Sequence, residues 1–419
     1  MSSTVAAAII AASVSFLTLI GTLAAQYLAR RATRRDLEEQ REQLDRTLAV
    51  QSTRALNERF ATAAGQLGDD KPPAARLAGV YAMAGLADDW PANRQTCVDV
   101  LCGYLRMPHE PEPGQDAPES KRLAFRASRE VRRTVIRVIA AHLQDGAVLS
   151  WQGLNFDFTG VVFDGGDFSG AIFSGGVADF TGAMFSGGVA DFTGAAFTGG
   201  EVRFSRAEFS GGTVDFSDAI FSGGKVLFSR ARIRRDGEVR FSGARFSGGV
   251  ADFSHAEFTG GAVAFAGAMF SGGEVRFSNA VFSDGTVFFG DAEFTGGAVG
   301  FAGAMFLGSQ VDFSRVTFSG SRVGFAGAMF SGGEVVFCRA RFEHGLILFS
   351  EAEFHQGSEV SFLDASFSGG VVVFDHAMFS GGVADFSAVS DWSLPPQFSW
   401  TDTPPSGVTL PKEEDQSQA

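Results

Sequence analysis

The chain has 419 residues, 44 of them phenylalanine and 53 glycine, and a formal net charge of −14. Three cysteines are too few for a disulfide framework, so we expect reduced thiols at Cys97, Cys102 and Cys338. Cys97 and Cys102 lie close together without a second cysteine pair, which favours core packing over a metal site.

The chain begins with an uncharged run from Val5 to Leu28, which at about 24 residues is long enough to cross a bilayer core. Four arginines follow it: Arg30, Arg31, Arg34 and Arg35. No Lys or Arg precedes the run, unlike in a cleaved signal peptide. We therefore expect a single-pass anchor in the cell membrane at 1–29, with the N-terminus outside and the remainder in the cytoplasm. The alternative is a buried helix of a soluble domain.

Helical patterns continue to about residue 148. A charged juxtamembrane helix is expected over 30–66, as a solvated stalk or a short coiled coil. A small helical region, 67–148, should follow it. Its expected helices run from Pro73 to Leu86, from Asn93 to Leu105 and from Lys121 to Leu143.

The last of these helices carries five arginines away from its apolar side. They are Arg126, Arg129, Arg132, Arg133 and Arg137. A solvated face is the favoured interpretation, and contact with anionic lipid is the alternative. Beyond this helix we expect Leu149, Trp151 and Leu154 to cover the start of the next domain.

From about Phe168 to Phe386, phenylalanines alternate at spacings of five and seven residues, which gives a repeat of twelve. A fixed period this short predicts a solenoid. One unit reads AAFTG at 195–199, then a Gly-x pair, then VRFSR at 202–206. In each five, a small or branched residue two positions before Phe shares its side of an extended strand. These side chains should fill the core.

Segments such as AEFSG at 207–211 and AIFSG at 219–223 resemble the unit of the pentapeptide-repeat family, A-(D/N)-L-x-x with Leu or Phe at its centre. The resemblance covers roughly 154–390. It implies a mainly β fold, a right-handed quadrilateral β-helix, which we expect over 149–394. The inserted Gly-x pair departs from the family's plain unit.

A second resemblance concerns the helical region. The residues GYLRMP at 103–108, after RQT at 94–96, look like the helical segment that precedes the repeats in actinobacterial membrane-anchored pentapeptide-repeat proteins. This resemblance implies the same order of anchor, helical region and solenoid.

Core volume predicts the size of one coil. A turn of twelve residues leaves too little room for two Phe rings, whereas four strands in 24 residues enclose stacked aromatic ladders. One extra residue lies between Ile233 and Phe241, and another lies between Phe354 and Phe362. Ten repeats separate the two insertions, so both should bulge from the same side of the rod.

Motifs for catalysis or ligand binding are hard to find in the repeat. The residues GGVAD at 187–191 resemble a calcium-solenoid unit, but the Asp is not maintained in later units. The Phe spacing excludes hexapeptide acyltransferases, and an ice-binding threonine ladder is also disfavoured. His344, His355 and His376 have no accompanying nucleophile set. We therefore expect no enzyme, cofactor or metal.

Most of the negative charge lies in the repeats, whereas the first 150 residues are nearly neutral. An acidic rod suggests the DNA mimicry that some pentapeptide-repeat proteins use against type II topoisomerases. Arginines interrupt this negative surface, and an anchor would keep the rod from the nucleoid. Mimicry is therefore the alternative function, and no direct nucleic-acid binding is expected.

The residue just before the second Phe of each unit should point outward, and its character changes along the rod. Early units carry Asp179, Asp191, Arg203, Asp215, Arg240 and Asp252, and later ones Phe288, Gly300, Gly324, Val336, Leu348 and Val373. We expect the apolar members, Phe288, Val336, Leu348 and Val373, to contact an unidentified protein partner or a second copy of the chain. β-propensity on a partly covered face is the alternative interpretation.

Trp392 and Trp400 are expected to cap the far end of the solenoid, and 395–419 is expected to be a disordered polar tail. The sequence as a whole therefore predicts a membrane-anchored scaffold or protein-interaction module without catalytic activity.

Overall fold

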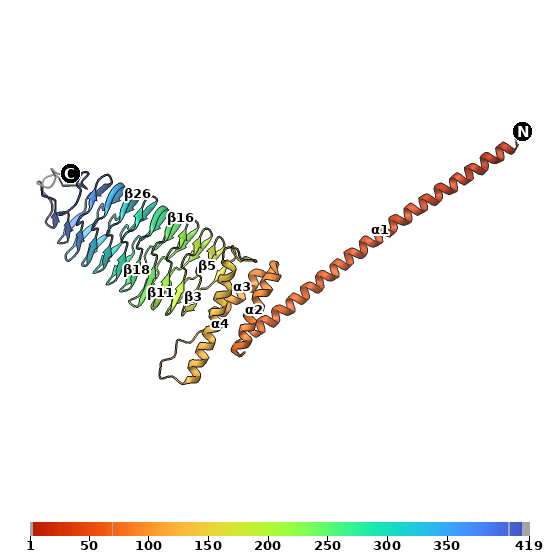
Figure 1. Ribbon diagram of the computed structural model, residues 1–419, viewed down its shortest axis with the longest axis horizontal. Coiled ribbons are helices and arrows are strands. Elements are labelled where there is room, and N and C mark those ends of the chain that lie inside the picture. Colours follow the sequence, from red (N-terminus) through yellow and green to blue (C-terminus); the bar gives the residue numbers. More distant parts are fainter. Residues whose placement is uncertain (1–2, 69, 401–402, 413–419) are drawn as a thin grey trace. The chain divides into compact units, whose positions relative to one another are not determined.

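The computed structural model describes residues 3–68, 70–400 and 403–412 (Figure 1). Side chains are described from residue 14 onward, except at 15 and 32 within the first helix. The chain divides into two compact units, Met1–Thr62 and Ala63–Ala419.

The first unit is helical. Helix α1 runs from Ser3 to Gln66, so its last turn belongs to the second unit. Large apolar side chains are exposed on its first half: Val14, Phe16, Leu17, Leu19, Ile20, Leu23, Tyr27 and Leu28. Among the described residues, no helix has the length and apolarity needed to span a bilayer. The anchor expected at 1–29 lies partly outside these residues, because side chains are described only from residue 14.

Short helices open the second unit: α2 (Pro73–Asp89), η1 (Pro91–Asn93), α3 (Arg94–Arg106) and α4 (Glu119–Leu143). Their bounds lie within a few residues of those expected. The buried side chains of α4, such as Val131, Val135 and Ile139, recur at helical spacing and face the other helices. On another side of the helix Arg129, Arg132 and Arg133 lie against the first coil of the next domain.

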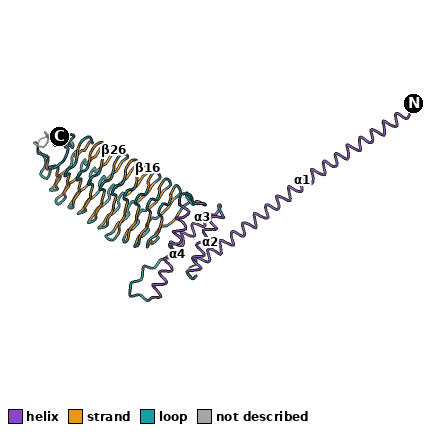
Figure 2. Tube along the Cα trace, viewed as in Figure 1, coloured by secondary structure: helices purple, strands orange, loops and turns teal. Residues whose placement is uncertain are grey.

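A solenoid of about ten coils follows, wound from short parallel strands (Figure 2). One coil contains the four strands β9 (Glu201–Arg203), β10 (Glu208–Phe209), β11 (Gly212–Asp215) and β12 (Ile220–Phe221). The next strand, β13 (Lys225–Leu227), pairs with β9 and places Val226 opposite Val202. The coil is therefore 24 residues long, which confirms the prediction from core volume.

The strands form three sheets, and two sides of each coil contribute to the first. Sheet A contains β9, β12, β13, β1 (Phe156–Asp157), β4 (Ile172–Phe173), β5 (Val177–Asp179), β8 (Ala196–Phe197), β16 (Arg245–Asp252), β19 (Met269–Arg276), β22 (Glu293–Phe294), β23 (Ala298–Gly300), β26 (Thr317–Gly324), β29 (Arg341–Leu348), β32 (Ser366–Phe367), β33 (Val371–Phe374) and β36 (Gln397–Phe398). Sheet B contains β10, β2 (Val162–Phe163), β6 (Met184–Phe185), β14 (Arg232–Ile233), β17 (Glu257–Thr259), β20 (Val281–Ser283), β24 (Met305–Leu307), β27 (Met329–Ser331), β30 (Glu353–His355) and β34 (Met378–Ser380). Sheet C contains β11, β3 (Gly166–Asp167), β7 (Val189–Asp191), β15 (Gly237–Arg240), β18 (Ala262–Ala264), β21 (Thr286–Phe288), β25 (Gln310–Asp312), β28 (Glu334–Val336), β31 (Glu359–Ser361), β35 (Val383–Asp385) and β37 (Val408–Thr409).

Stacked phenylalanines fill the interior. Phe204 and Phe228 lie one coil apart, with ring centroids 4.8 Å from each other and an interplanar angle of 5°. Phe216, from the opposite side of the coil, meets Phe204 edge to face at 5.5 Å and 87°. Offset stacks and perpendicular contacts are the arrangements that aromatic quadrupoles favour. The small residues two positions before Phe are buried beside the rings in nearly every strand, as predicted.

Both single-residue insertions lie at the corner between sheets B and C. Gly212 of β11 lies opposite Gly237 of β15, and Glu334 of β28 lies opposite Glu359 of β31. These steps are one residue longer than the coil. The prediction that both insertions share one side of the rod is confirmed.

Glycine pairs occupy tight corners for two separate reasons. Gly273 has φ of +69°, a conformation that side chains with a Cβ disfavour. At its neighbour Gly272 the constraint is steric, because a Cβ there would lie 2.5 Å from the carbonyl oxygen of Ser247 in the preceding coil. Only the second glycine of this pair has a positive φ.

Aromatic side chains close the far end of the solenoid. Trp392 contacts the rings of Phe367 and Phe386. The ring centroids of Trp400 and Phe398 lie 4.1 Å apart, which confirms the expected caps. The segment expected to be a disordered tail contains ordered strands, since β37 pairs with β35 through Val408 and Ala384. Residues 413–419 of that segment lie outside the described residues.

Candidate interaction surface

Four apolar side chains from two adjacent coils form a patch on the outer side of sheet A. Leu346 lies opposite Val371, and Leu348 lies opposite Val373, in the pairing of β29 with β33. All four alternate with buried residues along their strands, so they point outward. We call Leu346, Leu348, Val371 and Val373 the sheet A patch.

The structure places the other two expected contact residues on a different sheet. Phe288 and Val336 belong to sheet C, where the pairing puts Asp312 between them. Phe288 is 39% exposed. The four residues expected to form one apolar row therefore divide between two sheets, and only Leu348 and Val373 are brought together.

The length of the coil explains this division. A row of positions twelve residues apart, which is half of a coil, alternates between sheets A and C. Stacked residues are those about 24 apart. Leu346 and Val371 lie two positions before Leu348 and Val373, so they fall outside the pattern of residues that directly precede Phe.

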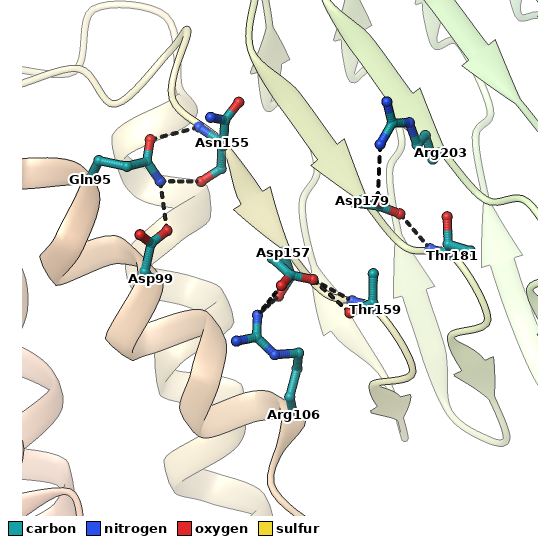
Figure 3. Close-up of polar contacts among 9 residues, drawn as sticks. All are labelled: Gln95, Asp99, Arg106, Asn155, Asp157, Thr159, Asp179, Thr181 and Arg203. Atoms are coloured by element: carbon teal, nitrogen blue, oxygen red, sulfur yellow. Dashed lines mark hydrogen bonds and ion pairs between the residues drawn. The ribbon is translucent and has the colours of Figure 1, made fainter.

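In the first half of the solenoid the outer side chains form charge pairs. Arg203 donates a hydrogen bond to Glu201 Oε1 at 2.8 Å. It donates another to Asp179 Oδ2 at 3.1 Å (Figure 3). The bond from Arg203 is the main cause that lowers the pKa of Glu201. Arg240 and Arg276 each bind a glutamate two residues earlier. Most of these outward arginines therefore balance local carboxylates.

Aspartates before Phe have a structural role in the turns. Asp179 Oδ1 accepts a hydrogen bond from the backbone N–H of Thr181 at 2.9 Å, and Asp157 holds Thr159 in the same way (Figure 3). Such side-chain bonds stabilise the corner that follows each strand. Within the described residues, no group of three or more His, Cys, Asp or Glu is placed to hold a metal ion.

Helix α3 covers the exposed edge of the first coil (Figure 3). Gln95 Nε2 donates to the carbonyl oxygen of Asn155 at 2.8 Å, and Gln95 Oε1 accepts from the N–H of Asn155 at 2.9 Å. Arg106 binds both the carbonyl oxygen and the carboxylate of Asp157. The side-chain amide thus takes the place of a neighbouring strand at an edge that would otherwise remain unpaired.

Three arginines of α4, Arg129, Arg132 and Arg133, continue this edge, which corrects the expectation of a solvated side for them, whereas Arg126 and Arg137 are exposed as expected. Arg132 is buried and donates to the carbonyl oxygens of Leu105 at 2.8 Å and Val162 at 2.9 Å. Arg129 and Arg133 both reach the carbonyl oxygen of Asp164. Helical periodicity identified a polar side but could not show that a sheet edge lies against it.

The cysteines and the three histidines singled out by the sequence are spread over several segments of the second unit. Burial raises the pKa of the Cys102 thiol to about 12 and raises that of Cys97, so both stay protonated near neutral pH. His344 lies on β29, His355 lies 2.9 Å from Glu353 on β30, and His376 lies in the turn after β33. The three histidines that the sequence singled out do not form one site.

Comparison with models of known protein families, with curated proteins and with solved structures finds no match to the chain. The regular parallel solenoid, with its central Phe in successive short strands, fits a pentapeptide-repeat protein.

Proposed function

We propose that this chain is a membrane-anchored, non-catalytic scaffold of the pentapeptide-repeat type, wound as a right-handed quadrilateral β-helix. The observation that carries the scaffold role is the sheet A patch. It places four apolar side chains in register on one sheet. In the preceding coil Gly324 lies opposite Leu348 and adds no side chain, and Arg322 lies opposite Leu346 at the edge of the patch. Flat apolar surface beside charged surface is typical of a protein-binding site.

The proposed partner of the patch is a protein, either a second copy or a different chain. The test is the double substitution Leu348→Asp and Val373→Asp in the full-length protein. Chemical crosslinking in native membranes followed by gel analysis should lose the bands that the parent forms. Leu227→Asp is the matched control, because Leu227 points outward from the same sheet between Arg203 and Asp252. Unchanged crosslinking in the double variant would refute this role.

The proposed anchor rests on the uncharged run Val5 to Leu28 and the arginines after it. The exposed apolar side chains of α1 from Val14 to Leu28 support it, because a contiguous exposed apolar surface of this kind is unusual for a segment in water. Deletion of 1–29 should release the protein from the membrane fraction. Full-length protein that washes off membranes with alkaline carbonate would contradict an integral anchor.

A second candidate is mimicry of DNA against a type II topoisomerase. The observation that favours it is a row of carboxylates on sheet C, where Asp167, Asp191 and Asp215 lie opposite one another in successive coils. Inhibition of gyrase supercoiling at stoichiometric concentration of the protein would support mimicry. No inhibition in that assay would leave the scaffold as the better proposal.

A further inference from the structure

A basic hollow lies on the outside of the solenoid, at the corner where strands of sheet A turn into sheet B. Its volume is about 630 Å³. The positive lining residues are Arg206, Arg230 and Arg232. His255, Glu257 and Asn279 also line the hollow, and Val281 and Met305 line its other end. A protein with a net charge of −14 thus carries a localised cationic site.

Two stacked columns produce this lining. Arg206, Arg230 and His255 occupy the same corner in successive coils, where the N–H of each corner residue bonds to the coil that follows. In the second column, on sheet B, Arg232, Glu257, Val281 and Met305 lie opposite one another in order. Along this column the lining passes from Arg232 through the carboxylate of Glu257 to the apolar Val281 and Met305, over roughly three coil steps or 14 Å.

The corner arginines are held in an unfavourable backbone conformation. Arg206 and Arg230 have φ of 57° and 58°, in the left-handed region where a Cβ is disfavoured. At the same corner in other coils the chain uses glycine, for example Gly182 and Gly303 with φ of 65°. Glycine at the corners of Arg206 and Arg230 would remove this strain.

The same two cations also lie one above the other, roughly 4.8 Å apart at the backbone, so their charges repel. Among the described residues, no carboxylate forms an ion pair with either guanidinium. Arg232 is balanced in part by Glu257 at 3.5 Å. An anion between Arg206 and Arg230 would relieve the repulsion.

We propose that this hollow binds a small organic phosphate. Its phosphate group would lie between the guanidinium groups of Arg206 and Arg230, which match phosphate oxygens in geometry and charge. His255 lies at the next corner of the column and would donate a further hydrogen bond. The apolar body of the ligand would cover Val281 and Met305. The volume is within the range of small-molecule sites.

The test uses isothermal titration calorimetry of the full-length protein with phenyl phosphate as the probe. Arg230→Gly should weaken binding at least tenfold, and Arg206→Gly with Arg230→Gly should abolish measurable heat. Because glycine suits the left-handed corner, both variants should keep or raise the apparent melting temperature. Arg230→Asn, which also tolerates this conformation, provides a second neutral substitution.

Arg339→Gly is the matched control. Arg339 has φ of 57° but lies at another corner, 3.4 Å from Asp364, and its loss should leave binding unchanged. Equal binding by parent and Arg230→Gly, or equal weakening by Arg339→Gly, would overturn the proposal, as would a parent that shows no saturable binding. Inorganic phosphate should bind more weakly than phenyl phosphate, and equal affinity would refute the apolar part of the site.

Discussion

The interior and the outer rows of the solenoid differ in how much they vary. Inside, nearly every coil repeats Phe at the same four places, and the rings stack at about the same spacing from Phe158 to Phe398. Outside, the same row of sheet A reads Asp179, Arg203 and later Leu348. This difference indicates that the inward residues determine the fold, whereas the outward residues determine what each part of the solenoid can bind.

The largest expected effect is on the free energy of unfolding, and it distinguishes a buried phenylalanine from one that points outward. Phe216→Ala should lower the free energy of unfolding by about 3–5 kcal/mol, because Phe216 is fully buried between two perpendicular neighbours, Phe204 and Phe228. Phe288→Ala should lower it by only about 1 kcal/mol, since that ring points outward and is 39% exposed. Urea denaturation measures both, and similar losses would remove the distinction between inside and outside.

Arg132 sharpens the comparison, because it is a charged residue that belongs to the interior. Arg132→Met leaves the carbonyl oxygens of Leu105 and Val162 without this donor and should cost about 1.5–3 kcal/mol of unfolding free energy. Arg137→Met, at an exposed position of the same helix, should cost within about 0.5 kcal/mol. A neutral result for Arg132→Met in the same denaturation assay would show that this edge needs no cap.

Ile233 is the one aliphatic residue in its ladder, between Phe209 and Phe258. Ile233→Phe should restore ring stacking and raise the unfolding free energy by about 0.5–1 kcal/mol. Urea titration again provides the measurement. A destabilised variant would mean that the adjacent insertion needs the smaller side chain, and the interior would then be less uniform than proposed.

The smallest expected effect concerns an outer charge pair. The pKa of Glu201 is lowered, mainly by the hydrogen bond from Arg203. Its stabilisation is therefore present above the unfolded pKa of about 4.3 and is lost as pH falls through the lower folded value. Between pH 5 and pH 3, Glu201→Gln should lose less stability than the parent, by at most about 1 kcal/mol for this partly exposed pair. Arg203→Met should flatten the dependence similarly, and an unchanged slope would argue against the pair.

Much of the interior could be predicted from the sequence, because core volume and the Phe spacing admit few solutions. Coil length and the shared side of the two insertions followed from these alone. The outer rows were harder. A period of twelve hid the fact that Val336 and Leu348 lie on different sheets, although the 24-residue coil already implied it.

Other features had no signal in the sequence. The arginines of α4 look like any polar helix side until the edge carbonyls of Val162 and Asp164 lie against them. The polar composition around Val408 predicts disorder, and only the unpaired edge of β35 gives it a strand partner. In both cases the deciding group is a backbone atom far away in the chain.

Every coil adds the same distance along the axis of the solenoid, so the number of coils sets the separation of two surface sites. Five coil steps, roughly 24 Å, separate the strand β13 beside the basic hollow from β29 of the sheet A patch. Because Asp312 lies opposite Val336, excision of 313–336 would join Asp312 to Phe337 in register and shorten the spacing by one step. Duplication of the same stretch would lengthen it equally, so the distance between two surfaces can change while neither surface does.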